Sequence, residues 1–317
     1  MSNVRPVSRS RRTVLSVPGS NPRMVEKARG LDADEVFLDL EDAVAPSAKD
    51  DARRVVAAAL ADGDWHGKTL AVRVNDWHTT WTQRDVIDVL SGGGGARLDC
   101  LILPKVESAD HVVALDLLVS QCERDLGLDE GRIGIEAQIE SARGLLNIAA
   151  IAASSSRLES LVFGPADFMA SINMRGLVVG EQPPGYDVGD AFHHALMSIL
   201  VAARAYDLQA IDGPYLQIRD VDGFRRGAMR SAALGYDGKW VLHPDQIVAG
   251  NEIFTPAQAD YDHAEHILDA YAKSTSDEGG RRGAVMLGGE MIDEASRKMA
   301  SVIAAKGRAA GMRRTTA

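Results

Sequence analysis

The fold is decided by a pattern that is clearest at Val36-Phe37-Leu38-Asp39-Leu40-Glu41-Asp42, a short apolar run that ends in carboxylates. A longer stretch, Ala48–Leu60, follows it with apolar residues at i, i+3 and i+4, the spacing of an amphipathic helix. The same alternation recurs about eight times along the 317 residues. The eight runs that we expect to form strands are Val14–Val17, Val36–Leu40, Leu70–Val74, Cys100–Leu103, Gly134–Ile139, Ser160–Phe163, Gln209–Ile211 and Lys239–Leu242.

Strands that are apolar throughout and separated by helices predict a parallel sheet, because helices then cover both of its faces. Eight such units predict an α/β fold in the form of a closed (β/α)8 TIM barrel. An open, doubly wound sheet is the alternative. The choice depends mainly on Gln209–Ile211, the weakest of the eight strand predictions.

The remaining segments indicate how the chain is organised. We expect residues 1–12 to form a flexible N-terminal tail, residues 13–256 the barrel, and residues 257–317 a C-terminal helical extension and lid. The extension begins with a helix over Gln258–Lys273, and a glycine-rich break separates this helix from the tail that would act as the lid. Ser171–Asp190, after the sixth strand, is a long loop of a kind that often serves function.

The composition narrows the class of protein. With 45% hydrophobic and 25% charged residues, the chain is typical of a soluble globular protein, and its formal net charge of −10 argues against nucleic acid or an anionic membrane as the main partner. No run approaches the ~20 apolar residues that cross a bilayer. The polar, Arg-rich start lacks the apolar core of a secretory signal, with a short transit peptide as the alternative. We therefore expect a cytoplasmic protein whose two cysteines, Cys100 and Cys122, are reduced thiols.

Charged residues follow nearly every predicted strand, at the end where α/β barrels carry their active sites. Five of them are the acids Asp39, Glu41, Asp42, Glu140 and Asp167. So many carboxylates share a pocket at neutral pH only with a compensating cation. Oxygen ligands without a His or Cys cluster favour Mg²⁺, with Mn²⁺ as a substitute. We expect Glu140 and Asp167 to bind the metal directly, and Glu41 and Asp42 to act through metal-bound water; surface salt bridges are the alternative.

Four basic residues lie near the same ends of the strands. Arg73 closes an apolar strand, so its guanidinium should enter the mouth of the barrel and clamp a carboxylate or stabilise an enolate oxygen. Lys105 could do similar work or could neutralise the acids. Arg23 and Lys27 lie one helical turn apart and could meet the phosphates of a nucleotide-like tail, or form a solvated helix face.

Six stretches at these strand ends resemble the citrate lyase β-subunit-like, or HpcH/HpaI aldolase, family, in the family's order from about Thr13 to Pro256. The stretches are Ser16–Ser20, Asp39–Asp42, Val72–Asn75, Leu103–Val106, Phe163–Phe168 and Gly235–Pro244. Within that family the chain looks most like the malyl-CoA lyase branch. This likeness rests on Ser154–Leu158, on the long loop after Asp167 and on the tail motif Glu290-Met291-Ile292-Asp293.

The resemblance implies a reversible Claisen-type cleavage of (S)-malyl-CoA to acetyl-CoA and glyoxylate, with β-methylmalyl-CoA as a further substrate that yields propionyl-CoA and glyoxylate. Arg73 would stabilise the thioester enolate, and Glu41 and Asp42 would complete the catalytic set. Asp293 would move a proton at the acyl α-carbon from a lid over a neighbouring subunit. A site shared in this way implies a homotrimer or homohexamer.

The resemblance also implies that the metal holds a small 2-oxo acid, with further contacts from Gly164, Pro165, Ala166 and Asp167. The loop over Arg175–Asp187 departs from the malyl-CoA lyase pattern, which leaves the acyl-CoA and the 2-oxo acid open. Two other functions compete. One is a thioesterase in which Asp293 activates water against malyl-CoA or citramalyl-CoA, and the other is a citrate-lyase-like subunit that acts only with partners.

Overall fold

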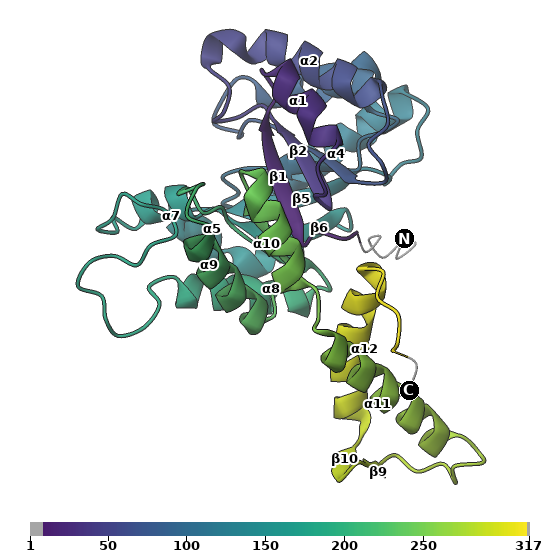
Figure 1. Cartoon of the computed structure of the whole chain (residues 1–317). Helices are drawn as coiled ribbons and strands as arrows, with labels where there is room; N and C mark the ends of the chain where they lie inside the picture. The colour runs from purple at the N-terminus through teal and green to yellow at the C-terminus, as the bar shows by residue number, and fades with distance from the viewer. Residues whose placement is uncertain (1–8, 316–317) are drawn as a thin grey trace. The chain divides into compact units, whose positions relative to one another are not determined.

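The computed structural model describes residues 9–315, and its contacts divide the chain into two compact units. The first unit ends at Phe254 and the second begins at Thr255 (Figure 1). The first unit contains all of the strands that the repeated sequence pattern predicts.

Eight parallel strands close into a barrel in which neighbours along the chain pair in order and β8 pairs with β1. The strands are β1 (Thr13–Pro18), β2 (Glu35–Asp39), β3 (Thr69–Arg73), β4 (Cys100–Leu103), β5 (Gly134–Ile139), β6 (Leu158–Phe163), β7 (Gln209–Asp212) and β8 (Gly238–Val241). The predicted (β/α)8 barrel is therefore confirmed. The weakest prediction, Gln209–Ile211, is a true strand that pairs with both β6 and β8, which rules out the open sheet.

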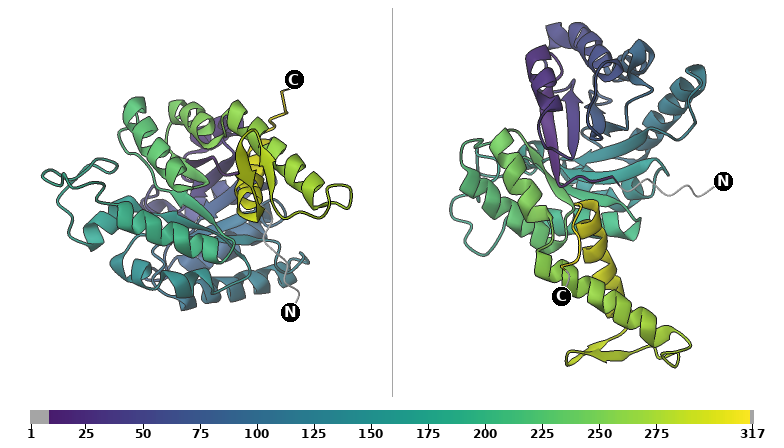
Figure 2. Two further views of the ribbon diagram at one scale, coloured as in Figure 1. Left: turned by 90° about the horizontal axis from the view of Figure 1, so that it is seen from below. Right: turned by 45° about the vertical axis from the view of Figure 1, so that its right-hand side comes forward.

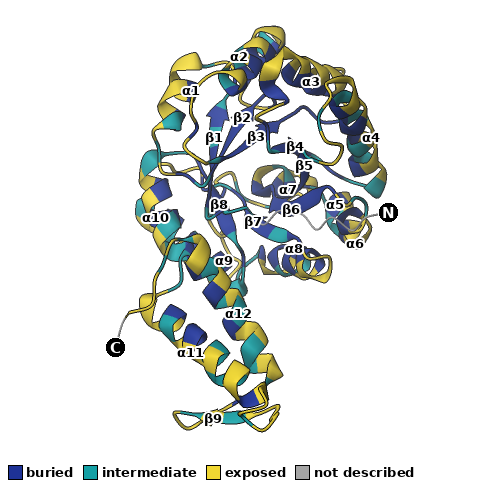
Figure 3. Cartoon of the chain, turned by 90° about the vertical axis from the view of Figure 1, so that its right-hand side faces the viewer, coloured by how far each residue is buried: buried dark blue, intermediate teal, exposed yellow. Residues whose placement is uncertain are grey.

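Helices surround the strands, with their inward faces buried and their outward faces exposed (Figures 2 and 3). They are α1 (Pro22–Arg29), the 3-10 helix η1 (Pro46–Ala48), α2 (Lys49–Ala61), α3 (Thr82–Val89), the π-helical turn η2 (Leu90–Gly94), α4 (Ala109–Asp125), α5 (Ala142–Leu146), α6 (Ile148–Ala152), α7 (Pro165–Ser171), α8 (His193–Ala205), α9 (Val221–Leu234) and α10 (Pro244–Phe254). None of the helices in residues 9–315 is long and apolar enough to span a membrane.

The interior of the barrel is apolar at mid-height and charged at both ends. Eight buried side chains pack together inside it, namely Val14, Phe37, Ala71, Cys100, Ile102, Val162, Ile211 and Trp240. Because strand side chains alternate between the two faces, the residues two positions further along β2 and β3, Asp39 and Arg73, also face inward. The carboxyl ends of the strands thus present buried charges above an apolar floor.

The amino end of the barrel corrects part of the expected N-terminal tail. Residues 1–8 lie outside the described residues, but Arg11 is fully buried rather than flexible. Its Nε lies 2.7 Å from Glu35 Oε2, and its Nη2 lies 2.8 Å from Glu159 Oε2. A buried guanidinium requires carboxylate partners, and the strands supply them, so the segment from Arg9 to Arg12 belongs to the barrel.

The second unit is a small helical assembly of α11 (Gln258–Thr275), the antiparallel hairpin β9 (Val285–Leu287) and β10 (Glu290–Ile292), and α12 (Glu294–Ala309). Ala264 on α11 packs against Ala300 and Ala304 on α12. Glu265 binds Arg308 and Arg314 by hydrogen bonds of 2.7 to 2.8 Å. The predicted helix at Gln258 is present, and the tail after it is a hairpin followed by a helix.

Candidate active site

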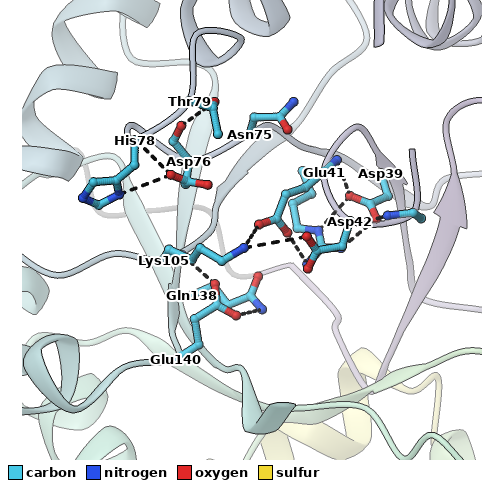
Figure 4. Close-up of polar contacts among 12 residues, drawn as sticks. Asp39, Glu41, Asp42, Asn75, Asp76, His78, Thr79, Lys105, Gln138 and Glu140 are labelled. Atoms are coloured by element: carbon cyan, nitrogen blue, oxygen red, sulfur yellow. Dashed lines mark hydrogen bonds and ion pairs between the residues drawn. The ribbon is translucent and has the colours of Figure 1, made fainter. Parts of the chain in front are cut away.

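The carboxyl ends of four strands bring the predicted charged residues together (Figure 4). Asp39 ends β2, Arg73 ends β3, Lys105 follows β4 and Glu140 follows β5. Asp39 binds Arg73, the backbone N–H of Lys105 donates to Glu140, and the Lys105 side chain donates to Glu41. The residues that the sequence pattern placed at the mouth of the barrel therefore form one connected cluster.

Asp39 and Arg73 form a two-pronged ion pair inside the barrel. Arg73 Nε donates to Asp39 Oδ1 at 2.8 Å, and its Nη2 donates to Oδ2 at 2.6 Å. Asp39 also accepts the backbone N–H groups of Glu41 and Ala43, so both of its oxygens are used. Burial alone would raise the pKa of Asp39, but the Arg73 charge lowers it, and the carboxylate stays ionised.

The Arg73 guanidinium lies over the apolar floor, 5.3 Å from the centre of the Trp240 ring and 5.8 Å from that of Phe37. Burial alone would lower the pKa of Arg73, but Asp39, Glu41 and Glu140 together raise it. The guanidinium is therefore a fixed positive charge whose plane is set by Asp39.

Glu41 lies between two cations. Its Oε2 is 2.8 Å from Arg73 Nη1, at an angle that makes an ion pair but no hydrogen bond, and its Oε1 accepts a hydrogen bond from Lys105 Nζ. Lys105 Nζ also lies 3.7 Å from Asp42 Oδ1, on an exposed side chain. In this arrangement Lys105 neutralises the acids, which is one of the two roles that its position in the sequence suggested.

Glu140 is buried and held by two donors. The backbone N–H of Lys105 donates to its Oε1 at 2.6 Å, and Gln138 Nε2 donates to its Oε2 at 2.7 Å. Lys105 reaches this position with a φ of 51°, which is uncommon for a residue other than glycine. Burial, then the charges of Glu41 and Asp167, raises the pKa of Glu140 well above its ordinary value. The Lys105 N–H and the Arg73 charge oppose this rise but do not cancel it.

Asp167 follows the sixth strand, as the sequence predicted, since β6 ends at Phe163. It does not lie directly at the tip of the strand, however, but in the first turn of the helix α7. The reason is Pro165, whose fixed φ suits the first position of a helix. Asp167 is half-buried, and its charge acts on Glu140.

The backbone over residues 164–167 offers fewer donors than expected. The Gly164 N–H already donates to Ile139 O at 3.0 Å, and Pro165 has no N–H. The N–H groups of Ala166 and Asp167 lie in the first turn of α7, where the helix itself provides no acceptor. Gly164 has another role, because a Cβ there would lie 2.4 Å from Glu140 Oε2.

The donor set at this end of the barrel fits a hard divalent cation. Within residues 9–315, no three His, Cys, Asp or Glu side chains are placed to hold a metal by themselves. Glu140 and Asp167 would supply two carboxylates, which is the usual share of the protein at a Mg²⁺ that also binds water and substrate. Burial and the neighbouring acids raise the pKa of Glu140, and a bound divalent cation would oppose this effect by stabilising the ionised carboxylate.

Three other predicted residues belong to α1 and to the second unit. Arg23 and Lys27 are exposed on α1, after β1, and no ion pair to either is found among the described residues. Asp293 belongs to the second unit and caps α12, accepting the Ser296 N–H at 3.0 Å in a capping box. The Ser296 N–H lowers the pKa of Asp293, which is therefore an anion at neutral pH.

Two buried contributors were missed by the sequence reasoning. Gln138 holds Glu140, and it lies two residues before Glu140 on the same strand face, which the alternation of strand side chains could have shown. Lys49 donates to Leu40 O, Glu41 O and Asn75 Oδ1 at 2.6 to 2.7 Å, and so supports the loop after β2. A lysine at the first position of a helix opposes the helix dipole, and this is a signal of another role.

Several known proteins are similar to this chain in sequence. Residues 12–244 match the HpcH/HpaI aldolase/citrate lyase family. An L-malyl-CoA/β-methylmalyl-CoA lyase from Rhodobacter capsulatus is 39% identical over 304 residues, which cover 93% of this chain and 94% of that protein. The citrate lyase subunit β of Escherichia coli K12 is 33% identical over 306 residues, which cover 96% of each chain.

Solved structures agree. Protein CitE from Mycobacterium tuberculosis, in complex with magnesium, acetoacetate and coenzyme A, aligns with a TM-score of 0.72 at 28% identity, over 95% of this chain and 99% of that chain. A citrate lyase from Burkholderia xenovorans LB400 aligns with a TM-score of 0.81 over 99% of this chain and 97% of that chain. At 20% identity, this second likeness concerns the fold alone.

Proposed function

The chain belongs to the HpcH/HpaI aldolase/citrate lyase family and is a carbon–carbon lyase, and from this premise we propose that it cleaves (S)-malyl-CoA reversibly to acetyl-CoA and glyoxylate. β-Methylmalyl-CoA, which would give propionyl-CoA and glyoxylate, is the proposed second substrate. The observation that carries the proposal is the buried cluster in which Glu140, under the charges of Glu41 and Asp167, lies beside a fixed Arg73. Such a cluster suits an anionic 2-oxo acid bound through a cation, next to a thioester.

The proposed metal is Mg²⁺, with Mn²⁺ as a substitute, held by Glu140 and Asp167. The Mycobacterium tuberculosis relative, crystallised with magnesium, acetoacetate and coenzyme A, supports this choice. When bound, the cation supplies Lewis-acid polarisation of the glyoxylate carbonyl. Glu41 and Asp42 lie on the loop after β2 and would meet water molecules around it. The N–H groups of Ala166 and Asp167 would help to orient the carboxylate of the 2-oxo acid.

Arg73 has the position and the charge to stabilise the thioester enolate. In the cleavage direction the bond between the hydroxyl-bearing carbon and the thioester α-carbon breaks, and its electron pair moves onto the thioester oxygen. A positive charge that Asp39 holds in place interacts with this developing negative charge more strongly than with the neutral thioester. Loss of Arg73 should therefore lower kcat more than it raises KM.

The proton balance requires a base and an acid. The malyl hydroxyl loses its proton as glyoxylate forms, and the α-carbon gains one as acetyl-CoA forms. We assign the proton at the α-carbon to Asp293, which is anionic and can take that proton in the condensation direction. As the malyl-CoA lyase resemblance implies, Asp293 would act from a neighbouring subunit, so the working unit would be a homotrimer or homohexamer. The CoA phosphates would meet Arg23 and Lys27.

A panel of thioesters tests this function. Malyl-, methylmalyl- and citramalyl-CoA are supplied with Mg²⁺, and glyoxylate, pyruvate and free CoA are followed together. Equal amounts of acetyl-CoA and glyoxylate from malyl-CoA support the lyase. Free CoA without glyoxylate would identify a thioesterase, and activity only with added partner proteins would identify a citrate-lyase-like subunit.

Variants test the site within the same assay. Glu140→Gln and Asp167→Asn should each remove Mg²⁺-dependent cleavage, because each removes one of the two proposed protein ligands. The matched control is Asp245→Asn, which changes an exposed acid in the first turn of the helix after β8, as Asp167 lies in the first turn of the helix after β6. Full turnover of Asp167→Asn or Glu140→Gln after chelation would show that the metal assignment is wrong.

A further inference from the structure

Gln138 is a polar side chain in the barrel interior that the reaction as proposed does not use. It is 3% exposed and lies on β5, where it pairs with Val162, a member of the apolar cluster inside the barrel. Its Nε2 donates to Glu140 Oε2 at 2.7 Å. Its Oε1 is buried, and among residues 9–315 it has no hydrogen-bond partner.

A glutamine in this place destabilises the fold in one respect. Burying an amide oxygen without a hydrogen bond costs about 1–3 kcal/mol, whereas a leucine of similar size has no polar atom to bury. The amide cannot gain by turning over, because its oxygen would then face the Glu140 carboxylate. The single contact that the side chain makes with Glu140 therefore accounts for its orientation.

The two donors on Glu140 act as a pair. Lys105 N–H holds Oε1 and Gln138 Nε2 holds Oε2, so each oxygen is fixed from the protein side and keeps a further lone pair. Gly164 closes a third side, since even a methyl group there would lie 2.5 Å from Glu140 Cβ. A carboxylate fixed in this way needs little reordering to accept a cation.

We propose that Gln138 is a positioning residue that sets the divalent-cation affinity of this chain by orienting the Glu140 carboxylate. The inference rests on the proposed function, in which Glu140 binds the metal. Removing the Nε2 donor while keeping the volume of the side chain should free the Glu140 carboxylate to rotate. The affinity for the cation should then fall by about 10- to 100-fold, as it does when other hydrogen-bond partners of metal ligands are removed.

The measurement is the Kd of Mn²⁺ for the full-length protein after chelator treatment, followed by electron paramagnetic resonance without any substrate. The test variant is Gln138→Leu, and Gln138→Met, with a more adaptable side chain, serves if the first does not fold. The matched control is Ser160→Ala, because Ser160 Oγ donates to the buried Glu136 Oε2 at 2.6 Å on the same pair of strands. That control removes the same kind of contact from a carboxylate outside the proposed metal site.

Each outcome decides one point. A Kd that rises at least tenfold in the Gln138 variant and less than twofold in Ser160→Ala supports the inference. An unchanged Kd in a folded Gln138 variant overturns the inference and leaves the metal site standing. Equal weakening in both variants also overturns it, since the effect would then reflect a loosened barrel. If the wild-type protein binds no Mn²⁺ at a single site, the metal assignment itself falls, and the inference falls with it.

Discussion

Gly164→Ala is the sharpest single-atom test of the site. Gly164 has a φ of −104°, which alanine also adopts, so the added methyl group acts through space and not through backbone strain. Its Cβ would lie 2.4 Å from Glu140 Oε2 and 2.5 Å from Glu140 Cβ, whereas ordinary contact begins at 3.4 Å. The Glu140 carboxylate would have to move by 3.4 − 2.4 = 1.0 Å, or the backbone would have to move instead.

This displacement is large for a metal ligand. Metal–ligand distances vary by only about 0.2 Å, so a shift of 1.0 Å removes Glu140 as a ligand in its present orientation. We expect Mn²⁺ affinity to fall by about 100-fold, equivalent to about 2.8 kcal/mol. The extra methyl group in a packed site should also lower the free energy of unfolding by about 1–3 kcal/mol.

The assay pairs Mn²⁺ titration with the rate of malyl-CoA cleavage, and thermal unfolding confirms that the variant is folded. Gly250→Ala is the control, because its Cβ would lie 2.5 Å from Thr13 Cγ2, a clash of the same size against a side chain with no charge. A folded Gly164→Ala protein with wild-type Mn²⁺ affinity and turnover would refute the reasoning that the Glu140 carboxylate must move, and wild-type Mn²⁺ affinity in Glu140→Gln as well would refute Glu140 as a ligand.

Three further predictions concern other residues. Arg73→Lys loses the two-pronged contact with Asp39, so kcat should fall by about 10²- to 10³-fold with little change in KM; an unchanged kcat in steady-state kinetics would contradict its role. Hydrogen bonds from Arg308, then from Arg314, lower the pKa of Glu265 to about 2. These ion pairs therefore stabilise the folded second unit fully above the unfolded pKa of about 4.3, and the stabilisation is lost as the pH falls from there to about 2. Circular dichroism should show acid unfolding of the second unit in that range, and the helical signal of Glu265→Gln should depend less on pH. The same pH profile in the wild-type protein and in Glu265→Gln would count against the ion pairs. Mixed oligomers of Asp293→Ala and Arg73→Ala protomers should regain part of the activity, whereas none would be regained if Asp293 acts only within its own subunit.

The repeated strand and helix pattern was enough to predict the barrel, because strand and helix periods are local properties of the chain. The carboxylates at the mouth were predictable for a related reason. Parallel strands in a closed barrel all end at one rim, so residues that follow each strand must gather there. Even the short β7, Gln209–Asp212, formed as expected, because a closed barrel leaves no edge without a partner.

Local pattern was a poor guide where a contact or a neighbouring residue decided the outcome. Arg11 reads as part of a polar tail, yet Glu35 and Glu159 draw it into the amino end of the barrel. A serine precedes both α4 and α5, yet only Ser141 accepts a capping hydrogen bond, from Gly144 N–H at 3.0 Å, and the Ser108 side chain accepts none. Asp167 follows the sixth strand as predicted, but the residues after Phe163 start a helix, so it lies in the first turn of α7.

The sequence by itself determined which chemical groups this protein brings to the mouth of its barrel. Only the tertiary structure decided which of them are already paired. Asp39 forms an ion pair with Arg73, and Glu41 forms ion pairs with Arg73 and Lys105. Glu140 accepts hydrogen bonds from two neutral donors, the Lys105 N–H and the Gln138 amide. Strand periodicity sets the face on which a side chain lies, but distances between groups on different strands depend on how the barrel closes and on the loops that leave it. Those distances separate a carboxylate that contacts a cationic side chain from one that contacts neutral donors alone.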